Sequence, residues 1–416
     1  MKKKFKNLLF VLVLLMTLIL LLSIFYGVYI TISNSTENRS ISNDNSFRFD
    51  MIREVNKNYK NTNYLISPYS IEVALSMVRD GAYSTTLEEL ESVVPERKIE
   101  DIRIKKKINV ANALFIKDVY GKNIKLDYKY KMKKDYNSKI LVDKFDTPKV
   151  INDWAKRETD GMIDDVVDDI SPEFVLGIAN AVALDVEWNS EFECNNTKRD
   201  IFISNGKNID VAMMSNSYRN DASYFDTDSE KGVIIPYKYY DKKSGKEDYT
   251  KNSELEFIGI LPKTDINSYI DKIDGNLFKN IEKNKKKAGS DLTIGVKIPR
   301  FSYSFDYSNF KEGLMDMGLK EMFTPSADFS RITDIDVYIS KAVHKTFIDL
   351  NESGTKAAAV TYFGFEKNAI DIVENDVEIS FNKPFIYMIR YKNEIVFFGV
   401  VYKPEKWTSS TIACKE

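Results

Sequence analysis

Histidine and cysteine are almost absent from this chain of 416 residues, which has one histidine and two cysteines. A zinc site made of such ligands needs several of them close together, whereas Cys194, His344 and Cys414 are widely spaced. An enzyme with a Ser-His-Asp or Cys-His site would have to use His344 alone. We therefore expect neither a metal site nor a cofactor. The two cysteines form one disulfide or stay as free thiols, and their spacing fits both alternatives.

An excess of charge of either sign is also missing, since 60 lysines and arginines stand against 62 aspartates and glutamates. A protein that binds nucleic acid through its overall charge usually carries a basic surplus, so we expect no nucleic-acid partner. Glycine and proline are scarce, at 17 and 10 residues, while hydrophobic residues make up 43%. This balance excludes collagen-like and wholly disordered chains and leaves ample apolar material for a large core.

The amino-terminal segment carries the clearest local pattern. Lysines near the start precede an uncharged apolar run over 8–32. As a helix this run would be roughly 37 Å long, which suffices to cross a bilayer with tilt. A cleavable signal peptide normally has an apolar region of only about 7–15 residues. We therefore predict an uncleaved signal anchor, with a secreted form after cleavage as the alternative.

The flanking residues predict the orientation of this anchor. The lysines before it and the near-neutral, Asn/Ser-rich stretch after it place the amino terminus inside the cell. We expect a cytoplasmic tail over residues 1–7, a transmembrane anchor over 8–32 and a polar tether over 33–46. The body of a single-pass membrane protein then follows outside the cell.

Hydrophobic periodicity predicts helices early in the body and strands mainly late. Helices are expected at 69–78, 86–94, 150–157 and 307–317. Strands are expected at 109–117, 178–188, 254–262, 291–301, 344–350, 384–391 and 395–401. Regular βαβ alternation is missing, which favours an α+β fold over a doubly wound sheet.

Several short motifs follow one another along the body. They are NYLISPYSI at 63–71, VANALF at 110–115, IPRF at 298–301, ISKAVH at 339–344, FNKPF at 381–385 and FFGV at 397–400. In this order and spacing they resemble the serpins, a family of protease inhibitors that trap their targets by a conformational change. The resemblance covers nearly all of residues 47–404.

The resemblance implies the serpin fold, with three β-sheets, a cluster of about nine helices and an exposed reactive-centre loop at about 352–380. Residues 47–404 would form one domain, followed by a C-terminal tail over 405–416. We expect the protein to be a monomer.

The segment 350–361, LNESGTKAAAVT, joins a turn-prone start to a run of small and β-branched residues. Its alanines alone would favour a helix, but the β-preferring residues that follow suit a strand or an exposed loop. By resemblance this segment is the hinge of the reactive-centre loop. The hinge residues are Glu352, Gly354, Thr355, Ala357, Ala358 and Ala359.

The resemblance also implies a mechanism. A target protease cleaves the loop and stays bound to it as an acyl-enzyme, while the hinge end inserts into the central sheet. Alternate residues of an inserted strand share one face, and a large or charged residue facing the core would stall insertion. The alternate positions here are all small, namely Thr355, Ala357, Ala359 and Thr361.

Three hinge positions depart from the inhibitory pattern. Ser353 replaces an acid, Lys356 stands where glutamate is common, and Val360 replaces alanine. We expect Ser353 and a solvent-facing Lys356 to do little harm, and the β-branching of Val360 favours a strand. The hinge therefore fits an inhibitor, and the alternative is a non-inhibitory binding or carrier protein of the same fold.

The cleaved bond follows by counting along from the hinge in the family's register. This register places the bond between Asn368 and Ala369. One residue earlier would make Lys367 the bait residue and imply a trypsin-like target. Phe363 or Phe365 would instead suit a chymotrypsin-like or elastase-like protease.

The resemblance further implies a buried polar cluster beneath the opening of the central sheet, made of Ser67, Ser70, Asn180 and His344. A broken buried hydrogen bond leaves an unpaired group that costs about 1–3 kcal/mol, so the cluster would act as a latch. Trp188 resembles the tryptophan where the loop first inserts, and simple core packing is a compatible interpretation. Just before it, Leu-Asp-Val-Glu at 184–187 replaces the usual Phe-Lys-Gly, so a lysine becomes an acid.

We therefore expect an irreversible inhibitor of serine or cysteine proteases and not an enzyme. A hydrolase that uses Ser67 or His344 is the alternative from another class, but no Gly-x-Ser-x-Gly elbow surrounds Ser67. The expected partners are the target protease and, through residues 8–32, the membrane.

Overall fold

The computed structural model of the chain describes residues 46–94, 96, 99–356 and 376–408. These ranges hold eight α-helices and three β-sheets, where about nine helices were expected. The predicted cytoplasmic tail and anchor, and nearly all of the predicted tether, lie outside the described residues. Among the described helices, none is both long and apolar enough to cross a membrane.

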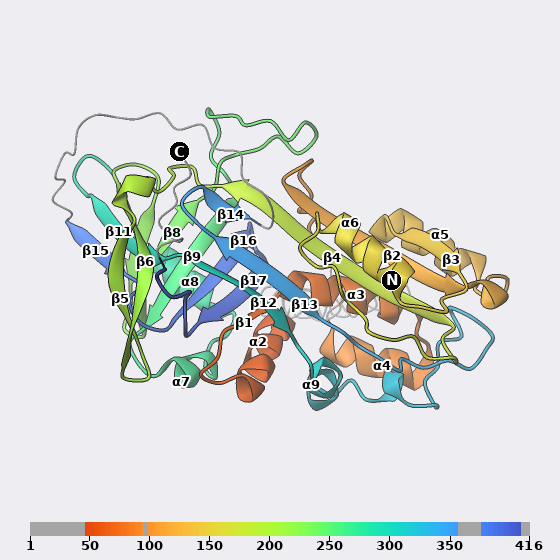
Figure 1. Ribbon diagram of the computed structural model, residues 1–416. Helices are drawn as coiled ribbons and strands as arrows, with labels where there is room; N and C mark the ends of the chain where they lie inside the picture. Colours follow the sequence, from red (N-terminus) through yellow and green to blue (C-terminus); the bar gives the residue numbers. More distant parts are fainter. Residues whose placement is uncertain (1–45, 95, 97–98, 357–375, 409–416) are drawn as a thin grey trace, which may run out of the picture.

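The largest sheet has seven strands and lies at the centre of the core (Figure 1). Its strands, in spatial order, are β1 (Tyr64–Ile66), β17 (Glu394–Val401), β16 (Phe385–Tyr391), β9 (Leu255–Pro262), β8 (Glu230–Pro236), β7 (Ser223–Asp226) and β10 (Lys285–Lys287). Every residue of β16 and β17 is buried. Their continuous apolar runs are typical of strands covered on both faces.

A six-stranded sheet crosses the molecule diagonally in Figure 1. Its strands, in spatial order, are β12 (Phe301–Asp306), β13 (Lys345–Leu350), β14 (Gly354–Lys356), β4 (Leu176–Glu187), β2 (Ile108–Lys117) and β3 (Lys139–Asp143). The short strand β14 lies between β13 and β4 and is antiparallel to both. Of the 12 residues of β4, only the last three pair with β14. The facing edges of β4 and β13 therefore form an opening below β14.

A four-stranded sheet completes the β structure. Its order is β15 (Val377–Ser380), β11 (Ile294–Pro299), β6 (Lys207–Tyr218) and β5 (Lys198–Ser204). The predicted reactive-centre loop leaves the six-stranded sheet at β14 and returns to the chain's described part at β15, which pairs with β11 in parallel. The two described ends of the loop thus belong to different sheets.

The helices surround these sheets. They are α2 (Ser46–Asn58), α3 (Pro68–Gly81), α4 (Ser84–Val93), α5 (Leu126–Tyr136), α6 (Lys149–Glu158), α7 (Ile266–Ile270), α8 (Asn276–Asn284) and α9 (Phe310–Asp316), with 3-10 turns at Asp118–Tyr120, Cys194–Asn196 and Glu321–Phe323. Helix α6 covers one face of the six-stranded sheet, where Trp154 packs edge-on against Phe115 of β2 with ring centroids 5.5 Å apart.

Helix α3 is fixed at both the local and the tertiary level. It begins after Ser67, whose side chain accepts a hydrogen bond from the N–H of Ser70, and proline occupies its first turn. On its inner face the carboxylate of Glu72 pairs with Arg48 of α2 at 2.9 Å. Arg48 also pairs with Glu394 of β17. This buried group joins two helices to the seven-stranded sheet.

The predicted α+β fold class is confirmed, and several predicted elements match. The predicted helices at 69–78, 86–94 and 150–157 correspond to α3, α4 and α6. The predicted helix at 307–317 begins only at Phe310, because the chain up to Asp306 belongs to β12. The predicted strand at 291–301 is divided between β11 and β12 at Arg300, just after Pro299, which lacks an N–H for a ladder.

Candidate functional site

The candidate site is the upper end of the opening between β13 and β4, where β14 lies. On the β4 side, Gly354, Thr355 and Lys356 stand opposite Glu187, Val186 and Asp185. On the β13 side, Thr355 and Lys356 stand opposite Leu350 and Asp349. The first residues of the hinge therefore already form a strand between two neighbours in the uncleaved chain.

Trp188 follows β4 and holds the turn that leads into β14. Its side chain is fully buried, and its indole N–H donates to the carbonyl of Asn351 at 2.9 Å. Its backbone N–H donates to the carbonyl of Ser353, also at 2.9 Å. The indole stacks on the ring of Tyr237, with centroids 4.6 Å apart and an interplanar angle of 9°. The start of the hinge is thus held by hydrogen bonds to Trp188, whose ring is stacked on Tyr237.

Glu352 lies in the same turn and is paired with a cation. Its two carboxylate oxygens each accept a hydrogen bond from Nε of Arg300 at 2.7 Å. Thr197 donates a further hydrogen bond to this carboxylate at 2.5 Å. Charge-assisted bonds to a buried carboxylate are among the stronger polar contacts in proteins. Because Arg300 lies between β11 and β12, this pair ties the hinge to the junction of two sheets.

Thr355 shows how little space the hinge has. Its side chain is 1% exposed, and its hydroxyl lies 2.6 Å from the hydroxyl of Tyr237. A cavity of about 10 Å³ lies beside it, lined among others by Val182 of β4, Phe347 of β13 and Met162. Such a volume holds roughly one water molecule. A large side chain at this position would therefore have to displace both flanking strands.

Gly354 is restricted by the backbone of β4. A Cβ atom at this position would lie 2.0 Å from the carbonyl oxygen of Val186. Any other residue would have to push the hinge away from β4, which would weaken the ladder. The glycine at this point of the hinge is thus required by close approach of the two backbones.

The structure brings Ser67, Ser70, Asn180 and His344 together beneath the opening. The backbone N–H of Ser67 donates to Nε2 of His344 at 3.1 Å, and the hydroxyl of Ser70 donates to Asn180. Asn180 belongs to β4 and His344 directly precedes β13, so the cluster contacts both sides of the opening. Its position fits a latch, which stays a proposal.

The polar cluster extends further than the sequence indicated. The side-chain amide of Asn180 donates to Asn112 of β2 at 2.6 Å, and Asn112 in turn donates to the carbonyl of Tyr136 at 2.7 Å. Asn112 lies within a motif that carried the family resemblance, but nothing in the local pattern indicated its contact with Asn180. The side-chain amides of Asn180 and Asn112 thus both have hydrogen-bond partners.

Ser67 and His344 do not have the geometry of a nucleophile and its base. The hydroxyl of Ser67 donates to the carbonyl of Val396 at 2.7 Å, and His344 accepts from the backbone N–H of Ser67 instead. Both side chains are buried. A nucleophile must offer its hydroxyl to the base and to a substrate, so this pair gives no support to the hydrolase alternative.

Burial also sets the protonation state of His344. It lowers the pKa of the imidazole from its ordinary 6.5 to about 4. The ring is therefore neutral near pH 7, which agrees with Nε2 acting as an acceptor.

Glu187 marks the other corner of the site, at the end of β4. Its carboxylate lies 3.1 Å from Nζ of Lys107 and 3.4 Å from Nζ of Lys238, and the hydroxyl of Tyr240 donates to it at 2.8 Å. Burial acts to raise the pKa of Glu187, but the hydrogen bond from Tyr240 and the two ammonium groups lower it to about 2. Glu187 is thus a fixed negative charge beside the hinge.

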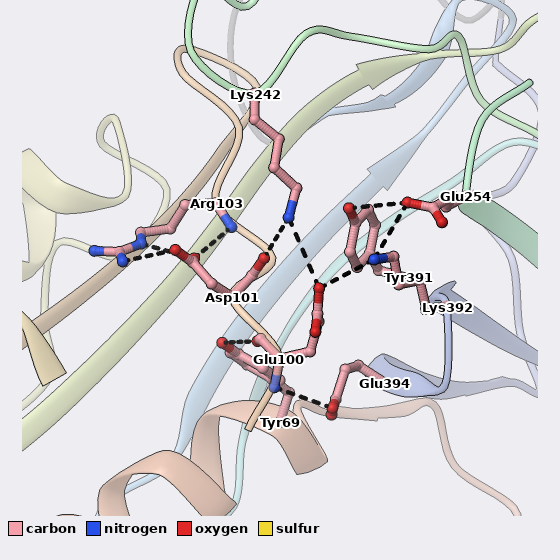
Figure 2. A network of polar contacts seen from close by, with 9 residues as sticks. All are labelled: Tyr69, Glu100, Asp101, Arg103, Lys242, Glu254, Tyr391, Lys392 and Glu394. Atoms are coloured by element: carbon pink, nitrogen blue, oxygen red, sulfur yellow. Dashed lines mark hydrogen bonds and ion pairs between the residues drawn. The ribbon is translucent and has the colours of Figure 1, made fainter. Parts of the chain in front are cut away.

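The loop that supplies Lys238 and Tyr240 is held in place by a second polar network (Figure 2). This loop joins β8 to β9, and Nζ of Lys242 donates to the carbonyl of Asp101 at 2.7 Å. In the same network Lys392 lies 3.1 Å from the carboxylate of Glu100. The network therefore fastens the loop to the segment before β2 and to the turn between β16 and β17.

Several predicted site residues lie outside the described residues. They are Ala357, Ala358 and Ala359 of the hinge and Lys367, Asn368 and Ala369 of the predicted bait. Cys194 is disulfide-bonded, and Cys414, the other cysteine of the sequence, also lies outside the described residues. Within the described ranges, no group of three or more His, Cys, Asp or Glu residues is placed to hold a metal ion.

Two contacts of the hinge were missed by the sequence analysis. Arg300 was noted as part of the IPRF motif, without its pairing to Glu352. Tyr237 was not singled out, although it contacts both Trp188 and Thr355. A lone tyrosine at the end of a strand gives no local signal for a partner more than a hundred residues away.

Comparison with known proteins agrees with this geometry. Residues 42–404 match the family model described as serpin, serine protease inhibitor. An uncharacterized serpin-like protein of Thermococcus kodakarensis is 29% identical over 402 residues, which cover 91% of this chain and 88% of that protein.

Solved structures of the family superpose on the chain as well. The native state of tengpin, a thermophilic serpin, has a TM-score of 0.71 and 29% identity, covering 86% of this chain and 93% of tengpin. A thyroxine-binding globulin in complex with thyroxine also has a TM-score of 0.71, at 20% identity, covering 88% of this chain and 100% of the globulin. At that identity the likeness shows the fold alone.

We predict that acid destabilises the protein through His344. A histidine whose pKa is lowered in the folded state contributes stability above its unfolded pKa of 6.5, and this contribution is lost as the pH falls towards 4. The loss amounts to about 3 kcal/mol. In thermal unfolding at pH 7 and pH 4.5, His344→Gln should lose less stability on acidification than the unmodified chain. An equal loss in both proteins would contradict the prediction.

Proposed function

This chain belongs to the serpin family, and from that premise we propose that it is an irreversible inhibitor of serine or cysteine proteases. The observation that carries the proposal is β14, the first described part of the hinge, which already lies between β13 and β4. Below it, no strand of the described ranges pairs with the facing edge of either neighbour. A cleaved loop can therefore lengthen this strand by adding main-chain hydrogen bonds.

The proposed reaction begins with attack by the protease nucleophile on the carbonyl carbon of the bait residue. The peptide bond breaks, the new amino group leaves on the carboxyl-terminal part of the loop, and the protease stays bound through an ester or thioester. Insertion of about fourteen residues, at roughly 3.3 Å each, would then move the protease on the order of 45 Å. A displacement of ~1 Å within a catalytic triad can cost about a hundredfold in rate. Hydrolysis of the ester or thioester therefore becomes slow once insertion has moved the protease.

The side chains that would enter the core support this proposal. The structure places Thr355 on the buried face of β14, against Tyr237. Strand alternation assigns Ala357, Ala359 and Thr361 to the same face. Small side chains there fit the narrow opening without overpacking the core.

A binding or carrier function without inhibition is the second candidate. The likeness to a thyroxine-binding globulin shows that the same fold occurs in a protein solved with a small ligand. The cavity beside Thr355 measures about 10 Å³, far below the roughly 300–1,000 Å³ of typical ligand pockets. A carrier would also be cleaved in its loop without inserting it and without a gain in heat stability.

The central prediction concerns a panel of trypsin-like, chymotrypsin-like, elastase-like, subtilisin-like and papain-like proteases. Mixed with the chain lacking residues 1–32, at least one should form a complex that survives boiling in denaturant, because the two proteins share a covalent bond. Sequencing of the released fragment then gives the bait. A fragment that begins at Ala369 identifies Asn368, and one that begins at Asn368 identifies Lys367.

Clean cleavage by every protease of the panel, with no complex and no rise in the melting temperature, would overturn the proposed inhibition. The melting temperature of the cleaved chain is the control for insertion itself, because it reports the added strand whether or not a protease is trapped.

A second prediction tests the hinge through Thr355→Arg. A guanidinium on the buried face would be desolvated and overpacked, so insertion should stall and the acyl-enzyme should hydrolyse. We expect the variant to be cleaved at the same bond. At least about ten times more of it should be consumed for each trapped protease, which corresponds to a change of ~1.4 kcal/mol in the difference between the barriers to insertion and to hydrolysis. Thr355→Ser, which keeps a small hydroxyl, is the matched control. Equal trapping by the arginine variant would exclude insertion at this position.

We also propose that residues 8–32 anchor the protein in the cell membrane, with its body outside. The uncharged apolar run and the lysines before it support this arrangement. The full-length chain should stay with membranes after alkaline carbonate extraction, and its intact mass should include the first 32 residues. A mature protein that begins after this segment would show instead that it is secreted.

A further inference from the structure

Large apolar side chains are exposed on the outer face of α5 and on the edge strand β3 beside it. Leu126 and Tyr130 lie one turn apart on α5 and are 79% and 66% exposed. Val119, in the 3-10 turn before the helix, and Val142 of β3 are 69% and 55% exposed. We call these four side chains the α5 patch. Single exposed apolar residues are normal, whereas a cluster of them marks an interaction surface.

The members of the α5 patch gather around Gly121. A Cβ atom at Gly121 would lie 3.9 Å from Cγ1 of Val142, so the turn that carries Val119 meets β3 at this point. Nζ of Lys129 donates to the carbonyl of Gly121 at 2.6 Å, which ties the same turn to α5 next to Tyr130. The patch is therefore one surface, built by a turn, a helix and an edge strand.

Lysines surround the α5 patch. The segment 117–144 has nine lysines and four aspartates, although acidic and basic residues are nearly balanced in the whole chain. A lysine at the inner flank of α5 has an acidic partner, since Nζ of Lys125 lies 2.6 Å from the carboxylate of Asp334. On the outer face, Lys133 and Lys134 have no carboxylate partner among the described residues. Their charge is thus available to an anionic partner.

An apolar patch surrounded by such lysines fits an anionic lipid bilayer. In this contact leucine and valine side chains enter the boundary between headgroups and acyl chains, and tyrosine lies at the level of the headgroups. Lysines extend to the lipid phosphates, and each one near an anionic surface adds to the attraction. A second copy of the chain fits less well, because a symmetric contact would bring the two sets of lysines together.

The position of the α5 patch in the molecule favours this partner. In Figure 1, α5 and β3 lie at one end, and β15, where the predicted reactive-centre loop returns, lies at the other. Residues 33–45 join the predicted anchor to α2, and a chain of this length spans at most about 45 Å. An anchored body would therefore stay close to the bilayer. Even a weak contact would then suffice, because the tether makes it intramolecular.

We propose that the α5 patch docks on an anionic lipid surface and that this contact turns the predicted reactive-centre loop away from the bilayer. The inference rests on the proposed function, because it adds an orientation to the proposed membrane anchor and to a loop that proteases must reach. Docked in this way, the body presents the end with β15 to the surrounding medium.

The test places a tryptophan in the α5 patch of the full-length chain, reconstituted into vesicles that contain phosphatidylglycerol with brominated acyl chains. Bromine quenches a tryptophan that enters the bilayer surface, so the emission added by Tyr130→Trp should fall by about half. Tyr249→Trp, at an exposed position of the loop between β8 and β9, is the control and should not be quenched. Leu126→Trp is the second probe where Tyr130→Trp disturbs folding.

Removal of charge tests the role of the lysines. Lys133→Gln combined with Lys134→Gln should lower the ratio of docked to undocked body by at least about tenfold in the Tyr130→Trp chain. Lys279→Gln combined with Lys283→Gln removes two exposed lysines one turn apart on α8 and should leave quenching unchanged.

Three results would overturn the docking. They are unquenched emission of both patch probes, equal quenching of the Tyr249→Trp control, and quenching that persists without the two α5 lysines. Emission of the patch probes that shifts to the blue with protein concentration in the absence of lipid would assign the patch to a second copy and overturn the proposal as well.

Failure of the docking can be distinguished from failure of the proposed function. A chain that stays with membranes after carbonate extraction but shows no quenching keeps the anchor and loses the docking. A secreted form that sediments with phosphatidylglycerol vesicles, and not with phosphatidylcholine vesicles, keeps the docking and loses the anchor. Trapping of proteases in the panel depends on neither result.

Discussion

The facing edges of β4 and β13, which below β14 have no partner strand among the described residues, are the constraint on which the rest of the structure depends. Backbone N–H and C=O groups at a strand edge need partners, and a sheet that leaves them without a ladder invites another strand. The chain meets this constraint at two places. Strand β14 fills the upper end, and the polar groups of Ser67, Ser70, Asn180 and His344 lie beneath the opening.

The contacts at the two ends of the opening stabilise the uncleaved structure and also leave the hinge able to lengthen. Ser67 caps the start of helix α3, and its backbone N–H donates to His344. The same residue therefore connects the start of the helix to the polar cluster beneath the opening. At the upper end, Trp188 and the pair Arg300–Glu352 fasten the turn before β14 while leaving the opening below it empty of any described strand. The hinge is therefore fixed at its origin and free to lengthen in one direction.

Much of this could be predicted from sequence, and the remainder could not for a physical reason. Helix α3 has strong local periodicity, the strands β16 and β17 have long apolar runs, and the motifs carried the fold. Helix α5 was missed because its buried stripe consists of only Tyr128 and Met132, too short an apolar pattern to stand out among the surrounding lysines. The contact of Tyr237 with Thr355 was missed because it joins residues 118 positions apart, and no local pattern encodes such a pair. The partial insertion of the hinge depends on many contacts of this kind.

Helix α6 and Met162 together determine what must move when the sheet opens. The helix packs on β2 through Trp154, and the side chain of Asn109 in β2 donates to the last turn of the helix at 2.7 Å. Separation of β4 from β13 can therefore carry α6 along as part of one rigid body, in the manner of a shear between packed layers. Met162, which lines the cavity beyond Thr355, is an unbranched side chain that changes rotamer at little cost. The cavity beside the hinge is thus lined in part by an adaptable side chain, which can move without disturbing the helix.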